Sequence, residues 1–545
     1  MEIFYFVTVK MLKIKNVIQN TKISSIKLII LIAVFWMAFA NLSFFKALLN
    51  DYPATIENIG FLSALTVGFT GAIIIALCLL CNRYSLKLLI IICLIISSLI
   101  AYFMDSYNTM IDDAMIKNAF ETDQKEMLGL ASPTMFLYFL LLGLLPSIFV
   151  YLAKIQYQPL KQEIIARAKT IFAVLIIVGI SFFIYSPNAT SFFREHKTTL
   201  YYSNPGNYAI GLVRYIRDIL KEKDRKLSLI GKDAKKPESD TQRELIIMVV
   251  GETARADRFS LNGYDQKTNP LLEKQNVVSF SNVESCGTLT AISVPCMFAI
   301  DQEDSFDSNK AKHKENALDI LKRSGAKVLW RDNNSSSKHV ADRVIYQDYQ
   351  SADTNTICDT ECRDEGMLVG LQEYINQQKN GDILIILHQM GNHGPAYYKR
   401  YPKEFERFTP ACHTNELSDC TEDEINNAYD NAILYTDYFL SKVIELLKQN
   451  DNRFETAMLY VSDHGESLGE NGLYLHGIPN FIAPQTQRHV PVIMWIGSAF
   501  DEISFDELKA KKDIPLTHDN IFHTLLGLME IDSKVYKKDM DFIKN

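Results

Sequence analysis

The sequence lacks the excess of basic residues that is typical of nucleic-acid-binding proteins. Its 545 residues include 56 lysines and arginines against 64 aspartates and glutamates, which gives a net charge of −8 at neutral pH. The basic pairs at 511–512 and 537–538 are too small to offset this balance, and we expect them to be solvated surface. The composition therefore gives no evidence for a nucleic-acid partner.

The first apolar run lacks a small-residue cleavage site and is too long for a cleaved signal peptide, so we expect no such peptide. Instead it opens a series of five apolar runs whose lengths suit a bilayer-spanning helix. These runs cover about residues 28–48, 59–81, 86–104, 130–152 and 171–185, the last being the shortest. The sequence therefore predicts an α-helical transmembrane domain of five spans within residues 1–190.

Positive charges are scarce in the loops on one side of these spans. Lysines or arginines precede the first span and occupy the second-to-third and fourth-to-fifth connections, whereas the other two loops are acidic or balanced. By the positive-inside rule, the amino terminus then lies in the cytoplasm. Everything after the fifth span is expected outside it, which is a periplasmic or extracellular address.

Cysteine is also scarce, with nine residues in the whole chain. Three of these, Cys78, Cys81 and Cys93, fall within predicted spans. There the role of a small apolar side chain is favoured over the metal or redox pair that a Cys-x-x-Cys spacing resembles. The other six follow residue 280 as close pairs, namely Cys286 with Cys296, Cys358 with Cys362, and Cys412 with Cys420. In an exported domain, these pairs predict three disulfides.

Residues 191–243 are polar and connect the spans to the rest of the chain. Within them, residues 208–223 predict an amphipathic helix suited to a membrane surface, and residues 224–240 predict a solvated linker. From 244 to 545, apolar runs alternate with helical segments, and strands are expected at 245–250, 328–330, 383–387, 458–461 and 492–496. This alternation predicts a mostly parallel α/β domain.

Metal-binding residue types follow two of these strands. Glu252 comes directly after the first strand, and Asp463 and His464 come after the strand at 458–461. Parallel strands end at one edge of a sheet, where open α/β folds place their active sites, so we expect the three side chains to meet. Such a mixed oxygen and nitrogen cluster suits zinc, and it predicts a metalloenzyme acting on phosphorus or sulfur esters.

A nucleophile is expected in the hydroxyl-rich loop between Cys286 and Cys296. Thr290 is the preferred candidate, because coordination to zinc would lower the pKa of its hydroxyl toward the alkoxide. Ser285, Thr288 and Ser293 remain alternatives on composition alone, since a loop hydroxyl is more often a turn former than a nucleophile.

Five ordered blocks of the chain carry a family resemblance. They are residues 250–257 (Val-Gly-Glu-Thr-Ala-Arg-Ala-Asp), the loop 286–296, residues 330–335 (Trp-Arg-Asp-Asn-Asn-Ser), residues 388–395 (His-Gln-Met-Gly-Asn-His-Gly-Pro) and residues 462–476. In these blocks the chain resembles the lipid A phosphoethanolamine transferases, including the mobile colistin resistance enzymes, of the alkaline phosphatase and sulfatase superfamily. The resemblance implies an alkaline-phosphatase/sulfatase-like periplasmic domain over residues 244–545.

The resemblance also implies roles for individual residues. Thr290 matches the family's nucleophile, and the catalytic zinc ligands match Glu252, Thr290, Asp463 and His464. His393, His476 and Lys338 match catalytic positions, and together with Ser335 they match positions that contact the substrate; the two histidines could instead hold a second zinc ion. Glu466 either orients a ligand or caps a following helix.

A polar patch before the soluble domain resembles the family's lipid-substrate contacts. Asn118, Thr122 and Glu126 are spaced by four residues, which places them on one helical face. A carboxylate such as Glu126 could pair with the ammonium of ethanolamine. On periodicity alone, an ordinary polar face of an external loop is the simpler interpretation.

Together these features imply transfer of phosphoethanolamine from phosphatidylethanolamine to a phosphate of lipid A. The expected protein is a monomeric, multi-pass enzyme of the bacterial inner membrane, and its activity is expected to confer resistance to polymyxin, colistin and other cationic peptides. The alternative is a phosphoethanolamine or phosphoglycerol transferase acting on another envelope glycan or glycolipid.

Two further alternatives concern the soluble domain. A sulfatase would share the fold, but the Cys-x-Pro-x-Arg context of its modified nucleophile is not matched at Cys296. A catalytically inactive binding module with a structural metal site is disfavoured, because a structural zinc site rarely needs a hydroxyl ligand.

Overall fold

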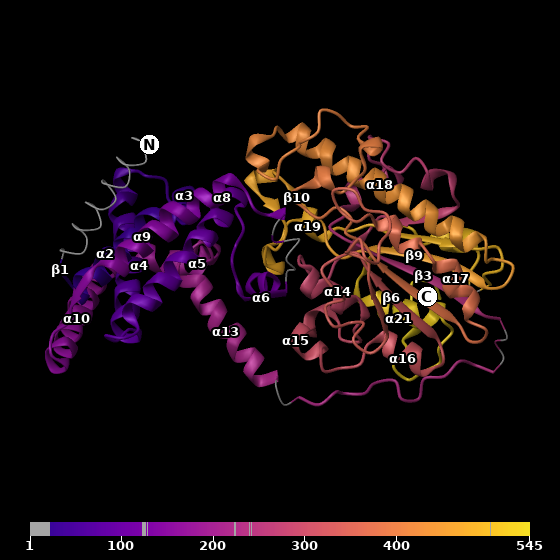
Figure 1. Ribbon diagram of the computed structural model, residues 1–545, viewed down its shortest axis with the longest axis horizontal. Coiled ribbons are helices and arrows are strands. Elements are labelled where there is room, and N and C mark those ends of the chain that lie inside the picture. Colours follow the sequence, from indigo (N-terminus) through magenta and orange to yellow (C-terminus); the bar gives the residue numbers. More distant parts are fainter. Residues whose placement is uncertain are drawn as a thin grey trace, which may run out of the picture. The chain divides into compact units, whose positions relative to one another are not determined.

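The computed structural model describes residues 22–121, 127, 129–222, 225–238, 240, 242–501 and 503–544 (Figure 1). The chain divides into two compact units. One comprises Met1–Asp113 and Ala131–Arg214, and the other comprises Ala114–Leu130 and Tyr215–Asn545. The short segment 114–130 therefore belongs with the second unit, although apolar helices of the first unit flank it in sequence.

Four helical stretches of the first unit are long and apolar enough to cross a membrane. They are α4 (Ile56–Leu80), α5 (Leu86–Tyr107), the continuous stretch Pro133–Leu152 made of α8, η1 and α9, and α10 (Leu160–Ile184). In α10 only 6% of the 18-residue apolar stretch that would cross the membrane is buried by protein. Such a surface is suited to contact with lipid.

The first predicted span is bent rather than straight. Residues 28–48 fall on α2 (Ser25–Phe39) and α3 (Leu42–Asp51), which meet at 61° and give a fifth span if the pair is counted as one. At the break, Nδ2 of Asn41 donates to the carbonyl of Trp36 at 2.9 Å and to that of Asn204 at 2.6 Å. This amide satisfies carbonyl groups where the helix is interrupted.

The predicted amphipathic helix is α13 (Gly206–Glu222). Its side chains Ile210, Val213 and Leu220 are 54%, 67% and 69% exposed.

The second unit is built on a seven-stranded sheet of order β4-β12-β9-β3-β8-β6-β7. Five neighbouring strands are parallel: β9 (Glu455–Ser462), β3 (Glu244–Gly251), β8 (Ile383–His388), β6 (Lys327–Asp332) and β7 (Ile345–Asp348). Strand β3 pairs with β9 as far as Gly251 opposite Ser462. The residues that follow both strands therefore emerge together at one edge of the sheet.

Helices lie on both faces of this sheet (Figure 1). Helix α18 (Glu422–Lys448) covers one face, and α16 (Ala317–Arg323) and α21 (Asp519–Leu528) cover the other. Every residue of β3, β8 and β9 is buried. The nearly continuous apolar sequence of these strands thus reflects a sheet covered on both sides.

The predicted α/β class is confirmed, but the edge of the sheet differs from expectation. Strand β12 (Val492–Ile496) runs antiparallel to both β9 and β4 (Val277–Phe280). The short strands β4 and β7 were not predicted. Both lie at the ends of the sheet order and have partly exposed residues, so their sequences carry a weaker apolar signal.

Candidate active site

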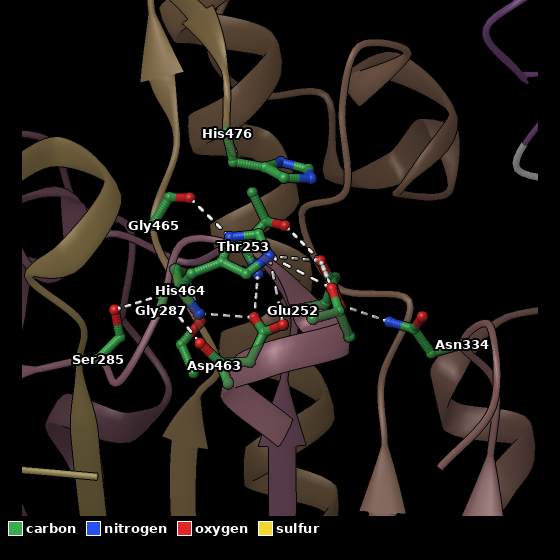
Figure 2. Close-up of polar contacts among 12 residues, drawn as sticks. Glu252, Thr253, Ser285, Gly287, Asn334, Asp463, His464, Gly465 and His476 are labelled. Atoms are coloured by element: carbon green, nitrogen blue, oxygen red, sulfur yellow. Dashed lines mark hydrogen bonds and ion pairs between the residues drawn. The ribbon is translucent and has the colours of Figure 1, made fainter. Parts of the chain in front are cut away.

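Glu252, Asp463 and His464 meet at the carboxyl edge of β3 and β9 (Figure 2). One potential ligand atom from each lies within 4.8 Å of the others, and all three residues are buried. Nε2 of His464 is 3.5 Å from Oε1 of Glu252 and 3.3 Å from Oδ2 of Asp463. The strand register brings together residues that are more than 200 positions apart in sequence.

The donor atoms of this cluster fit a metal ion. Nδ1 of His464 lies 2.9 Å from the carbonyl of Gly465 and can only donate to it. In the neutral ring the lone pair is therefore on Nε2, which faces the two carboxylates. Oδ2 of Asp463 is buried and has no hydrogen-bond donor among the described residues. A cation between these atoms would replace repulsion by coordination, and carboxylate and imidazole ligands are compatible with zinc.

Two carboxylates this close cannot be equally acidic. Burial alone would raise the pKa of Glu252, but the positive charge that His464 and His393 carry when they are protonated lowers it to about 2. Burial and the charge of Glu252 instead raise the pKa of Asp463 to about 6. The two carboxylates therefore place negative charge in a region from which water is excluded. This arrangement favours the binding of a cation.

Thr290 places its hydroxyl beside this cluster. Its Oγ1 lies 3.3 and 3.2 Å from the two carboxylate oxygens of Glu252 and 3.3 Å from Nε2 of His464. It is also the first residue of α14 (Thr290–Phe298), where the amino-terminal end of the helix favours a developing negative charge. The Cys286–Cys296 disulfide joins the preceding loop to this helix.

The competing hydroxyls are engaged elsewhere. Ser285 and Ser293 both donate to the carbonyl of Gly287 at 2.8 Å. Thr288 donates to the carbonyl of Ile478 at 2.7 Å. These three side chains stabilise the loop, as the turn-forming interpretation expects, while Thr290 directs its hydroxyl at the ligand cluster.

His476 and His393 lie next to this cluster. The ring centroids of His464 and His476 are 4.4 Å apart, and those of His476 and His393 are 5.6 Å apart. Nδ1 of His476 is 3.2 Å from Oε2 of the buried Glu466. Strand β10 (Ser467–Leu468) directly follows Glu466, so this residue does not cap a helix and is placed to orient His476.

Ser335 and Lys338 connect to the same site through Asn334. Nζ of Lys338 donates to Oγ of Ser335 at 2.9 Å, and Oγ of Ser335 donates to Oδ1 of Asn334 at 3.0 Å. Nδ2 of Asn334 in turn donates to Oε2 of Glu252 at 2.8 Å (Figure 2). All three residues lie in the loop that directly follows β6, and all are buried.

Sequence reasoning missed Asn334 and Thr253 as site residues. The backbone N–H of Thr253 donates to Oδ1 of Asp463 at 3.0 Å, and its hydroxyl donates to Oε1 of Glu252 at 2.5 Å. Both residues adjoin predicted site residues at strand ends. Their position next to a predicted site residue was the one signal in the sequence that could have identified them. The direction of each side chain depends on the path of a loop, and loops have no periodic sequence pattern.

The predicted lipid-contact patch is only partly described. Asn118 lies on α6 (Asp113–Glu121), whereas Thr122 and Glu126 lie outside the described residues. On the same helix, Lys117 donates to Oγ of Ser308 at 2.6 Å. Glu121 pairs with Lys312 at 3.0 Å, and its carbonyl lies 3.4 Å from Nζ of Lys338. Helix α6 thus packs beside the loop that carries Lys338.

The other predicted disulfides, Cys358–Cys362 and Cys412–Cys420, are also formed. Cys78, Cys81 and Cys93 are free thiols in the first unit.

Two family models match the chain, each over a different part. The model described as Sulfatase matches residues 244–531. The model described as Phosphoethanolamine transferase EptA/EptB matches residues 69–220. The site therefore lies within the part matched by the Sulfatase model, and the apolar helices from α5 to α10 lie within the part matched by the transferase model.

Known proteins resemble the chain over nearly its whole length. Phosphatidylethanolamine transferase Mcr-2 from Escherichia coli is 44% identical over 526 residues, which cover 94% of this chain and 96% of that protein. Mcr-1 from the same organism is 42% identical, with coverage of 98% and 100%. The structure of the integral membrane lipooligosaccharide phosphoethanolamine transferase A from Neisseria meningitidis superposes with a TM-score of 0.92 at 34% identity, covering 96% and 99%.

Proposed function

Because the chain belongs to the phosphoethanolamine transferase family, we propose that it transfers phosphoethanolamine from phosphatidylethanolamine to a phosphate group of lipid A. The donor follows from the names of the Mcr relatives, and the acceptor class follows from the lipooligosaccharide named for the Neisseria enzyme. The chain is a multi-pass protein of the bacterial inner membrane with its catalytic domain in the periplasm. Residues 1–190 would form the transmembrane domain, 191–243 the surface helix and linker, and 244–545 the catalytic domain.

The first chemical step uses Thr290 as the nucleophile. Its Oγ1 forms a bond to the phosphorus of phosphatidylethanolamine while the bond from phosphorus to the glycerol oxygen breaks. Oγ1 gives up its hydroxyl proton to a neighbouring imidazole, and the departing glycerol oxygen gains a proton in exchange, so that diacylglycerol leaves as a neutral alcohol. His476 and His393 are suitably placed for this exchange. The product is a phosphoethanolamine ester of Thr290.

In the second step, a phosphate oxygen of lipid A attacks the same phosphorus, and the bond to Oγ1 of Thr290 breaks. Lys338, held by Ser335, would favour the negative charge on the transferred group. The pair Glu466–His476 would keep the imidazole oriented through both steps. The attacking phosphate gives up its own proton and Oγ1 of Thr290 regains one, so that the hydroxyl of Thr290 is restored and the enzyme is regenerated.

Zinc is the metal we propose for the cluster, with Glu252, Thr290, Asp463 and His464 as its ligands and His393 and His476 as candidates for a second ion. When bound, zinc would lower the pKa of the Thr290 hydroxyl and offset the charge on the phosphoryl oxygens. The contacts of Thr290 are the observation that carries the proposal. Of the four candidate hydroxyls in this loop, only that of Thr290 faces Glu252 and His464.

Modification of lipid A would change the charge of the outer envelope. Adding phosphoethanolamine to a phosphate joins the two through a P–O–P bond, so that an ammonium group is added and the terminal phosphate is capped. The net negative charge of the lipid is then lower. Cationic peptides such as polymyxin and colistin would then bind less strongly. We therefore propose that expression of the chain confers resistance to them.

Mass spectrometry of envelope lipids tests the proposal directly. Cells that express the wild-type chain should contain lipid A with added phosphoethanolamine, and cells that express Thr290→Ala at equal abundance should not. Ser293→Ala is the matched control, because this hydroxyl lies in the same helix but donates to Gly287. Addition of phosphoglycerol, or modification of a different glycolipid alone, would reject the assignment in favour of the alternative transferase.

A further inference from the structure

His518 uses both ring nitrogens to bridge the two segments that carry the active site. Its Nδ1 accepts the backbone N–H of Cys286 at 3.2 Å. Its Nε2 lies 3.0 Å from the carbonyl of Ser462. Cys286 begins the loop that leads to Thr290, and Ser462 directly precedes Asp463.

These contacts define one protonation state. Since a backbone N–H can only donate, Nδ1 must be unprotonated, and since a carbonyl can only accept, Nε2 must carry the proton. The ring is fully buried, and burial lowers the pKa of His518 to about 3. His518 is therefore a fixed neutral tautomer, with one acceptor and one donor on opposite sides of a rigid ring.

The fold brings this ring to the site through a small separate sheet. Strand β13 (Leu516–Thr517) pairs in parallel with β5 (Val283–Glu284), and the N–H of His518 continues this pairing by donating to the carbonyl of Glu284 at 3.1 Å. On the other side, Oγ of Ser462 accepts the N–H of Ala254 at 2.8 Å. The imidazole thus links the Thr290 loop to the ends of both β9 and β3.

We propose that His518 is a positioning residue that sets the distance between Thr290 and the cluster of Glu252, Asp463 and His464. This inference rests on the proposed role of Thr290. Both ring hydrogen bonds go to the backbone of Cys286 and Ser462 rather than to a predicted ligand, so the effect of His518 reaches the reaction through that backbone. Loss of the bridge should slow the chemical step, because small misplacements of a nucleophile cost about 100-fold in rate.

His523 offers a matched control on α21 (Asp519–Leu528), the helix that His518 directly precedes. It is also buried, with 3% exposure, and its Nδ1 accepts the backbone N–H of Lys537 at 3.2 Å. His518→Phe and His523→Phe thus each remove one buried imidazole near the carboxyl end of the chain. Only the first removes contacts to the loop and strand of the active site.

The test compares turnover of a fluorescent phosphatidylethanolamine by the full chain in detergent, together with hydrogen exchange of peptides that contain Cys286. We expect His518→Phe to lower kcat by at least tenfold with KM within twofold, and to speed exchange at Cys286. His523→Phe should leave both within threefold of the wild type. Unchanged kcat or exchange in His518→Phe, or equal losses in both variants, would overturn the proposal.

Two conservative variants keep the test decisive if His518→Phe does not fold. His518→Asn retains an acceptor near the position of Nδ1, and His518→Gln retains a donor near the position of Nε2. Each should show an intermediate kcat, and wild-type rates in both would reject the bridge. If the wild-type chain itself does not cleave phosphatidylethanolamine, the proposed function fails, while the exchange comparison still decides whether His518 holds the loop.

Discussion

The amide of Asn334 donates a 2.8 Å hydrogen bond to the Glu252 carboxylate and so joins the loop after β6 to the ligand cluster after β3. Its second donor hydrogen is used by the carbonyl of Gln389 at 2.7 Å. The side chain therefore has little freedom to turn, and it fixes one oxygen of Glu252 while the other accepts from Thr253. Glu252 is held from both sides before any ligand binds.

We expect Asn334→Ala to lower kcat by about 10-fold to 100-fold, because partners that orient a metal ligand usually contribute that much. Zinc affinity should fall in parallel, as measured by competition with a chromogenic chelator. Asn431→Ala is the control, since this equally buried amide accepts from the backbone of Arg407 and Phe408. Wild-type zinc affinity in Asn334→Ala would contradict the argument.

The nucleophile can be identified by trapping the covalent intermediate. Incubation with phosphatidylethanolamine in the absence of acceptor should add one phosphoethanolamine group to the peptide that contains Thr290. Thr290→Ala should lose the adduct, whereas Ser293→Ala and Thr288→Ala should keep it, because those hydroxyls donate to backbone carbonyls. Peptide mapping by mass spectrometry measures this, and an adduct at another residue would refute the mechanism.

Removal of the metal should abolish turnover reversibly. Dialysis against a chelator is expected to release zinc and stop cleavage of phosphatidylethanolamine, and added zinc should restore it. Asp463→Asn should bind zinc more weakly, because it removes the negative charge of a carboxylate whose buried Oδ2 has no hydrogen-bond donor among the residues that the structure describes. Elemental analysis alongside activity provides the measurement, and full activity in a verified metal-free sample would exclude the proposed site.

Helix α6 provides a test of donor recognition. If Asn118 contacts the ethanolamine headgroup, Asn118→Ala should raise KM for phosphatidylethanolamine several-fold with little change in kcat. Asn58→Ala is a suitable control, because its amide donates to the carbonyl of Pro53 at the start of α4. An unchanged KM in Asn118→Ala would favour the simpler interpretation of this face as ordinary polar surface.

The neutral state of His518 makes a prediction about stability. Burial lowers its pKa from an ordinary value of 6.5 to about 3, so below pH 6.5 the unfolded chain binds a proton that the folded chain does not. Its contribution is therefore complete above pH 6.5 and is lost as the pH falls toward 3, by up to about 1.4 kcal/mol per pH unit. Thermal midpoints of wild-type and His518→Asn protein should converge between pH 6.5 and 4, and a constant gap would contradict this.

The position of the ligand cluster could be predicted from the sequence because strand ends are a property of apolar runs. Glu252, Asp463 and His464 each follow a run that is buried on both faces, and parallel pairing then brings them together. Asn334 and His518 could not be predicted in the same way. Their contacts depend on loop paths and on a short two-stranded sheet, neither of which leaves a periodic pattern.

The departures from the predicted fold have a similar origin. The apolar run 28–48 has span length, but length carries no information about a bend, which here occurs where Asn41 bonds to carbonyls. Likewise, the run at 492–496 predicts a strand without giving its direction, and β12 is antiparallel. Apolar length thus predicts which segments cross a membrane or pair in a sheet, but it predicts neither the bend of a span nor the direction of a strand.

The Cys286–Cys296 bridge encloses the segment in which Thr290 lies. A newly synthesised chain has reduced thiols while it remains in the cytoplasm, so this loop is completed only after export and oxidation. We therefore expect the enzyme to be latent during synthesis and its activity to depend on the oxidative protein-folding capacity of the compartment that it enters. A cell deficient in thiol oxidation would make the polypeptide and still lack the modified lipid.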